Sequence, residues 1–196
     1  MKISSFIRAA GAACAFALTG HASAAPIYQV NNSGILVGAK GVTVLGKMYD
    51  VSFGEGSCVS LFNGCDGASD FAFQNSADGK AAADALATQV FTGVFDTMGN
   101  TVNGCRGSFI CYTFVPWGVR DAQSFNLSYF LNYYEVNNPY DFVFESAIAA
   151  RDISYAGSNV NFASFKLSAT NVPEPGSIAL MGLAMAGLAL SRRRKS

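Results

Sequence analysis

Alternating apolar and polar residues predict several β-strands along the chain. Residues 42–53 are typical of a hairpin that turns at Leu45-Gly46-Lys47, with Tyr49, Val51 and Phe53 on one face. Pro116 indicates that the strand containing it ends at a sheet edge. Period-two patterns predict further strands at 109–117, 125–134, 140–148 and 160–167.

One segment instead repeats its apolar residues at helical spacing. Within 77–95 an apolar side chain recurs every four residues, and two phenylalanines widen the stripe, the positions being Ala82, Leu86, Val90, Val94, Phe91 and Phe95. We therefore expect one amphipathic helix there, capped by Ser76 or Asp78. Gly79 is expected to weaken its first turn.

Strands joined by short turns are typical of an antiparallel meander. The predicted fold is therefore α+β: a mostly antiparallel β-sheet with one packed α-helix, formed by a single domain at 25–171. An all-β sandwich is the alternative.

The first 24 residues are typical of a secretory signal peptide. Lys2 and Arg8 precede a short apolar run, and Ala22-Ser23-Ala24 is a small-residue cleavage site. We expect cleavage between Ala24 and Ala25.

The segment 172–196 has a second three-part layout. Val172-Pro173-Glu174-Pro175 precedes an uncharged apolar run, and Arg192, Arg193, Arg194 and Lys195 follow that run. A bilayer core needs about 20 helical residues, so a helix over about 176–191 is short, and snorkelling arginines can cover the deficit. The basic cluster predicts a single transmembrane helix with the domain outside.

This layout resembles the PEP-CTERM sorting signal of Gram-negative bacteria. The resemblance rests on Pro173-Glu174-Pro175, the apolar helix and the terminal basic cluster. It implies export, an inner-membrane-anchored intermediate, cleavage by an exosortase near the Pro-Glu-Pro segment, and release to the cell surface or the medium. It also implies an association with exopolysaccharide and biofilm.

The charge balance changes once both ends are set apart. The whole chain has 13 basic and 13 acidic residues, whereas 25–171 has seven basic and twelve acidic ones, a net charge of about −5. Such a domain has no basic excess for nucleic acid and is not drawn to anionic surfaces. The single histidine, His21, lies in the signal segment, which excludes His-dependent triads and His-ligated metals from the mature domain.

Four cysteines remain after the signal: Cys58, Cys65, Cys105 and Cys111. Their spacing favours the local disulfides Cys58–Cys65 and Cys105–Cys111, and an exported domain meets an oxidising compartment. A four-thiolate zinc site is the alternative, but spacings of seven and six are wider than those usual for zinc.

Three groups of side chains are candidate ligand sites. Asp66, Asp70 and Asp78 surround the first cysteine loop, and calcium prefers such oxygens, although the spacing does not match an EF-hand. Asp141 and Glu145 on one strand face would lie about 13 Å apart, too far for a glycosidase pair without a partner from elsewhere. Aromatic rings could stack on sugars at Trp117, Tyr129, Tyr133, Tyr134 and Tyr140.

We therefore expect an exported, non-enzymatic cell-surface or extracellular-matrix protein without a cofactor. Its expected partners are an exosortase-type enzyme, transiently the inner membrane, and exopolysaccharide. A carbohydrate-binding or adhesion module is the alternative, and a carboxylate-based glycan hydrolase is the second.

Overall fold

Seven strands and three short-to-medium α-helices make up the part of the chain that the structure, a computed structural model, describes: residues 25–105, 109–134 and 141–169. The helices are α1 (Cys58–Leu61), α2 (Ser76–Gln89) and α3 (Val94–Thr97). The strands are β1 (Ile27–Val30), β2 (Leu36–Val44), β3 (Lys47–Gly54), β4 (Ile110–Val119), β5 (Ser124–Tyr133), β6 (Phe142–Ala150) and β7 (Val160–Leu167).

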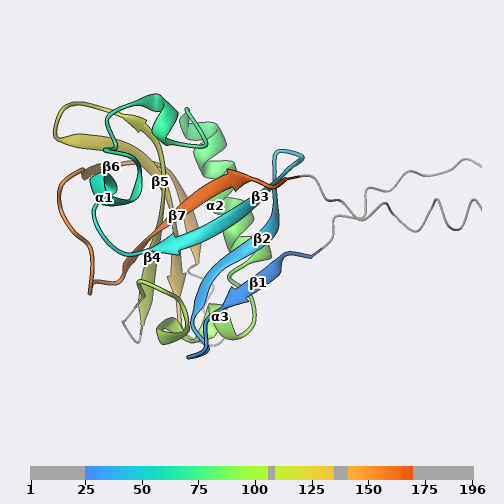
Figure 1. Cartoon of the computed structure of the whole chain (residues 1–196). Helices are drawn as coiled ribbons and strands as arrows, with labels where there is room; N and C mark the ends of the chain where they lie inside the picture. Colours follow the sequence, from blue (N-terminus) through green and yellow to red (C-terminus); the bar gives the residue numbers. More distant parts are fainter. Residues whose placement is uncertain (1–24, 106–108, 135–140, 170–196) are drawn as a thin grey trace, which may run out of the picture.

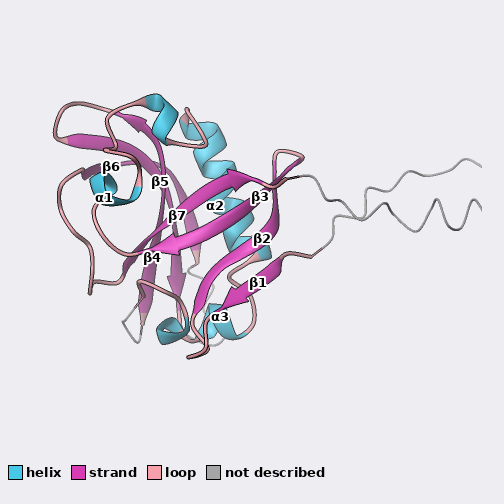
Figure 2. Cartoon of the chain, viewed as in Figure 1, coloured by secondary structure: helices cyan, strands magenta, loops and turns pink. Residues whose placement is uncertain are grey.

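The strands form one sheet in the order β1-β2-β3-β7-β4-β5-β6 (Figures 1 and 2). The expected mostly-β fold with a packed helix is confirmed, and the described strands do not split into the two sheets of a sandwich. The expectation of a purely antiparallel meander is wrong, because β7 does not pair with β6. It returns to lie between β3 and β4, antiparallel to the first and parallel to the second. The sheet is therefore mixed.

The predicted hairpin is present as β2 and β3. Val44 pairs with Lys47, which leaves Leu45 and Gly46 as a two-residue turn. Both turn residues have positive φ, 49° and 76°, as a type I′ turn requires. The face predicted from the alternation, Tyr49, Val51 and Phe53, is buried.

The sheet curls around α2, because the helix contacts strands from both sides of the strand order, including β2 and β6 (Figure 1). Its stripe Ala82, Leu86 and Val90 is buried in this main core. The helix ends at Gln89, however, and Val94 is 48% exposed rather than part of the stripe. The cap is Asn75, whose side chain accepts a hydrogen bond from the backbone N–H of Asp78, not Ser76 or Asp78.

Gly79 is a site of close approach between α2 and the sheet. A Cβ atom at this position would lie 2.5 Å from Cδ1 of Trp117 on β4. The glycine therefore lets the helix approach the indole ring, a packing role that its low helix propensity alone does not indicate.

The opposite face of the sheet carries a second core beneath α1 and the first cysteine loop. Its buried members are Cys58, Cys65, Phe62, Phe71, Phe125, Leu127 and Phe162. Strand β5 contributes to both cores, because Phe125 and Leu127 face one and Phe130 faces the other, as the predicted alternation requires.

One detail of the predicted strands differs, and the predicted open end of β4 is confirmed. Tyr129 pairs with Phe144 but Leu127 pairs with Ala147, so β6 holds one extra residue there. This bulge puts Ile148 on the opposite face from Phe144. Pro116 lies beyond the β7 pairing, which covers only Tyr112–Phe114, so this end of β4 has an unpaired side among the described strands, as predicted, although β4 pairs with both β5 and β7.

Candidate functional site

The predicted signal segment and the sorting tail lie outside the described residues, including Ala24, Val172, Pro173, Glu174, Pro175 and Arg192–Lys195. What the structure describes is where the chain leaves the domain toward them. Tyr28, Ala39, Val51 and Phe165 pair in one row across β1, β2, β3 and β7. The start of β1 and the end of β7 are therefore at the same end of the sheet, and both chain ends leave there (Figure 1).

No helix within the described ranges is long and apolar enough to cross a membrane. The predicted span at about 176–191 lies outside those ranges.

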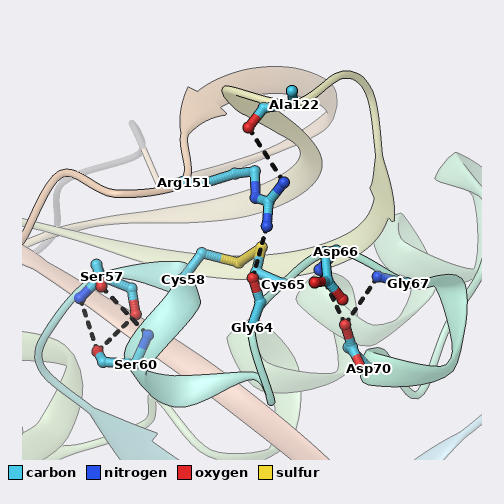
Figure 3. Close-up of a disulfide and its surroundings, with 10 residues drawn as sticks. All are labelled: Ser57, Cys58, Ser60, Gly64, Cys65, Asp66, Gly67, Asp70, Ala122 and Arg151. Atoms are coloured by element: carbon cyan, nitrogen blue, oxygen red, sulfur yellow. Dashed lines mark hydrogen bonds between the residues drawn. A yellow bond between two sulfur atoms is a disulfide. The ribbon is translucent and has the colours of Figure 1, made fainter.

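Cys58 and Cys65 form the predicted disulfide, with Cα atoms 5.6 Å apart (Figure 3). The loop that they close contains Asn63, Gly64 and Cys65 in succession, all with positive φ. Such a backbone conformation is unfavourable for the two non-glycine residues and persists only where the surroundings impose it. The disulfide is one such restraint.

Arg151, at the end of the β6 segment, is the second restraint. Its guanidinium donates one hydrogen bond to the carbonyl oxygen of Gly64 at 2.7 Å and another to that of Ala122 at 3.1 Å (Figure 3). One side chain thus joins the cysteine loop to the turn before β5. Residue spacing does not indicate this role, because the three residues are far apart in the chain.

The calcium candidates have local structural roles. The carboxylate of Asp70 accepts hydrogen bonds from the backbone N–H groups of Asp66 and Gly67, at 3.0 and 2.9 Å. The Gly67 hydrogen bond is the largest cause that lowers the pKa of Asp70 below its usual value. Asp78 instead accepts from Asn75 at the start of α2. Within the described residues, no three acidic, Cys or His side chains come together in a way that could hold a metal ion.

Cys105 and Cys111 form the second predicted disulfide, with Cα atoms 5.4 Å apart. Both are buried in the main core. Pairing of all four cysteines excludes the zinc alternative, because zinc requires free thiolates.

An acidic pair that the sequence does not reveal lies at one end of α2. Asp141 precedes β6, Asp96 lies in α3, and both line a cavity of about 620 Å³ together with Asp84. The pKa of Asp141 is raised to about 6, mainly by burial and also by the hydrogen bond to Asp96 and its charge, while the hydrogen bond from the backbone N–H of Tyr133 lowers it. Two carboxyl groups in direct hydrogen bond are closer than the roughly 5 Å of a retaining glycosidase.

Glu145, the other carboxylate of the hydrolase hypothesis, lies elsewhere on β6. Its Oε1 accepts a hydrogen bond from Ser76 at the start of α2, while Asp141 is adjacent to α3. The structure therefore pairs Asp141 with Asp96 and not with Glu145.

Aromatic rings form a row on the outer face of β4, β5 and β6. Tyr129 stacks on Phe144 at 4.4 Å, Phe144 contacts Phe142 at 4.5 Å, and Tyr112 lies 5.8 Å from Tyr129. Phe142 and Phe144 are 38% and 40% exposed. Of these four rings, only Tyr129 was among the predicted sugar-binding residues.

The other predicted rings do not join this row. Tyr134 is buried, and burial raises the pKa of its hydroxyl. Trp117 packs against the main core beside Gly79. Tyr133 is on β5, where its backbone N–H donates a hydrogen bond to Asp141, and Tyr140 lies outside the described residues. The alternation of Phe142 and Phe144 is visible in the sequence, but their contact with rings on the neighbouring strand is not, so the sequence alone did not indicate the row.

Comparison with known protein families gives a match to the tail. The family model of the PEP-CTERM protein-sorting motif matches residues 171–195. No curated protein and no solved structure matches the chain. The match contains the Pro-Glu-Pro segment, the apolar run and the basic cluster. The chain therefore carries a PEP-CTERM protein-sorting motif at 171–195, which indicates export and a membrane-anchored processing intermediate that is an exosortase substrate.

Proposed function

We propose that this chain is a non-enzymatic protein of the cell surface or extracellular matrix, delivered by its tail and associated with exopolysaccharide. The signal peptide is removed between Ala24 and Ala25, the segment at about 176–191 holds the intermediate in the inner membrane, and an exosortase cuts near Pro173-Glu174-Pro175. The observation that carries the proposal is the sorting motif at 171–195.

The described domain supports this role in two ways. Its four cysteines are joined in two local disulfides, which are stable in an oxidising compartment outside the cytoplasm. Both chain ends leave the same end of the sheet, so a domain anchored by its tail presents the opposite end away from the membrane (Figure 1).

The sorting step is tested by fractionation of cells. Replacing Arg192, Arg193, Arg194 and Lys195 with glutamine removes the charges expected to stop the chain in the membrane. We expect this variant to lose its membrane-bound intermediate and its processing, whereas Arg120→Gln, an exposed cation in the domain, leaves both unchanged. An unchanged distribution of the tail variant would contradict the proposal.

The non-enzymatic role is tested with the native exopolysaccharide as substrate. We expect no turnover by the mature protein. Hydrolysis that is abolished by Asp141→Asn or Asp96→Asn would overturn this part of the proposal and favour the carboxylate-based hydrolase.

A carbohydrate-binding module is the second candidate, and the aromatic row favours it. Exposed rings across adjacent strands offer flat apolar surfaces that suit the C–H faces of sugars. Phe144→Leu keeps an apolar side chain but removes the ring, so it should weaken binding to the native exopolysaccharide about tenfold if rings stack on sugar. Ile153→Ala, at another exposed apolar position, is the control. Equal binding by both variants would remove this candidate.

A further inference from the structure

The end of the domain where the chain exits carries an unusual set of exposed side chains. We call the exit end the start of β1, the β2–β3 turn and the end of β7. Ile27, Leu45 and Leu167 lie there and are 70%, 64% and 60% exposed. Large apolar side chains this exposed, gathered on one end of a domain, are typical of an interaction surface.

Register places these residues at the same end of the sheet. Ile27 pairs with Lys40, and Leu167 pairs with Tyr49, whose β2 partner is Val42. Leu45 follows Val42 by three residues, at the tip of the β2–β3 hairpin. With a strand rise of about 3.3 Å per residue, the pairing row of Leu167 lies about 10 Å behind Leu45 and that of Ile27 about 16 Å behind it.

Leu45 is unfavourable at this position for two independent reasons. Its φ of 49° belongs to the left-handed region, which favours Asn, Asp or Gly in a type I′ turn. It also exposes most of an apolar side chain to water. Neither the turn nor the core explains a leucine here, and such local conflicts are expected at functional sites.

The charge at the exit end is opposite to that of the whole domain. Lys40, Lys47 and Lys166 are exposed there, and none makes an ion pair among the described residues. Lys40 and Lys166 flank Asp50, whose carboxylate accepts hydrogen bonds from Gly41 N–H and the Ser168 hydroxyl. Three of the domain's seven basic residues thus surround the exposed apolar side chains.

The tail limits how far this end can lie from a membrane. Only residues 170–175 separate the last described residue, Ala169, from the apolar segment that begins at Gly176. The seven steps from Ala169 to Gly176 span at most about 25 Å even when extended. The exit end is therefore the part of the domain that meets the bilayer in the anchored intermediate.

We propose that the exit end docks the domain onto an anionic phospholipid surface. Leu45 enters the interface at the hairpin tip, with Leu167 and Ile27 behind it, while Lys40, Lys47 and Lys166 reach the headgroups. This inference rests on the proposed function only for the anchoring by the tail. Docking would hold the Pro173-Glu174-Pro175 segment at the membrane, where the processing enzyme acts.

The first test places a tryptophan at the hairpin tip of the full chain, reconstituted in vesicles that contain brominated phosphatidylcholine and phosphatidylglycerol. We expect strong quenching in Leu45→Trp and none above background in Ile153→Trp, the control at another exposed apolar position. Trp117 gives the same background in both. Omitting phosphatidylglycerol should lower the quenching. Replacing the three lysines with glutamine should also lower it, because the ratio of docked to undocked domain should fall about fivefold for each lysine removed. Equal quenching at 45 and 153 would overturn the proposal.

A second variant separates docking from folding. Leu45→Asn suits the turn, so its Tm should rise by roughly 2–4 °C. Hydrogen exchange in the β2–β3 turn should nevertheless lose the protection that phosphatidylglycerol vesicles give the unmodified chain. Retained protection in this variant would contradict the docking role of Leu45.

Vesicle flotation distinguishes anchoring by the tail from docking of the domain. A chain that floats with the vesicles but shows no lipid-dependent quenching is anchored and not docked, which overturns only this inference. A chain that does not float overturns the anchoring and the docking together.

Discussion

The guanidinium of Arg151 lies 2.7 Å from the carbonyl oxygen of Gly64, a residue 87 positions earlier in the chain. The same guanidinium holds Ala122. This contact joins the strained first cysteine loop to the β5–β6 part of the sheet, so the loop depends on it as well as on its disulfide.

Arg151→Lys should therefore destabilise the domain although it keeps the charge. An ammonium group cannot reproduce the fork of two hydrogen bonds, and a carbonyl that loses a charged donor costs about 2 kcal/mol in the free energy of unfolding. Urea unfolding under oxidising conditions measures this. Arg120→Lys, whose side chain is about half exposed, is the control and should change little. Equal effects of both would show that the Arg151 contacts do not restrain the loop.

Removing the first disulfide should weaken the same loop. In the chain-entropy model, Cys58→Ala with Cys65→Ala lowers the free energy of unfolding by about 2.5 kcal/mol. Because Arg151 and the disulfide restrain one loop, their combined loss should be non-additive. A double-mutant cycle from urea unfolding tests this, and strict additivity would show that the two restraints are independent.

Gly79→Ala should reverse the usual effect of this substitution in a helix. Alanine normally stabilises a helix by about 1 kcal/mol relative to glycine. Here the new Cβ would lie 2.5 Å from the Trp117 ring, and such overpacking costs about 1–3 kcal/mol. Thermal unfolding should show a loss for Gly79→Ala that Trp117→Leu relieves. A gain in stability would mean that the helix does not approach the ring this closely.

Asp141→Asn should stabilise the domain at neutral pH and not in acid. Burial and Asp96 raise the pKa of Asp141 to about 6, above its unfolded value of 3.8, so the folded state favours the protonated carboxyl. Stability therefore falls as the pH rises from about 4 to about 6 and stays lower above that. The asparagine removes this loss, a gain on the order of 1 kcal/mol at pH 7 after solvent screening. Unfolding measured at pH 4 and pH 7 tests it; an equal change at both would contradict the assignment.

The local elements could be predicted from the sequence because their signals are local. The spacing of Ala82, Leu86 and Val90 predicted α2, and the alternation around Tyr49 predicted the β2–β3 hairpin. The end of the helix was misplaced because α2 ends at Gln89, and Gly93, with a φ of 61°, then separates it from α3, which begins at Val94. The apolar spacing continues across that interruption.

The arrangement of the strands and the Asp96–Asp141 pair could not be predicted in this way. The place of β7 between β3 and β4 depends on pairings over more than 40 residues, which periodicity does not encode. Asp96 and Asp141 belong to different elements and meet only through the curl of the sheet around α2. The sorting motif could be predicted without knowing the fold, because its three parts are consecutive in the sequence.

Export and tail processing are best tested by mass spectrometry of the protein from cells and from the medium. We expect a mature N-terminus at Ala25, a C-terminus at or near the Pro173-Glu174-Pro175 segment, and disulfides Cys58–Cys65 and Cys105–Cys111. An intact, reduced chain in the cytoplasm that still begins at Met1 and ends at Ser196 would contradict the account.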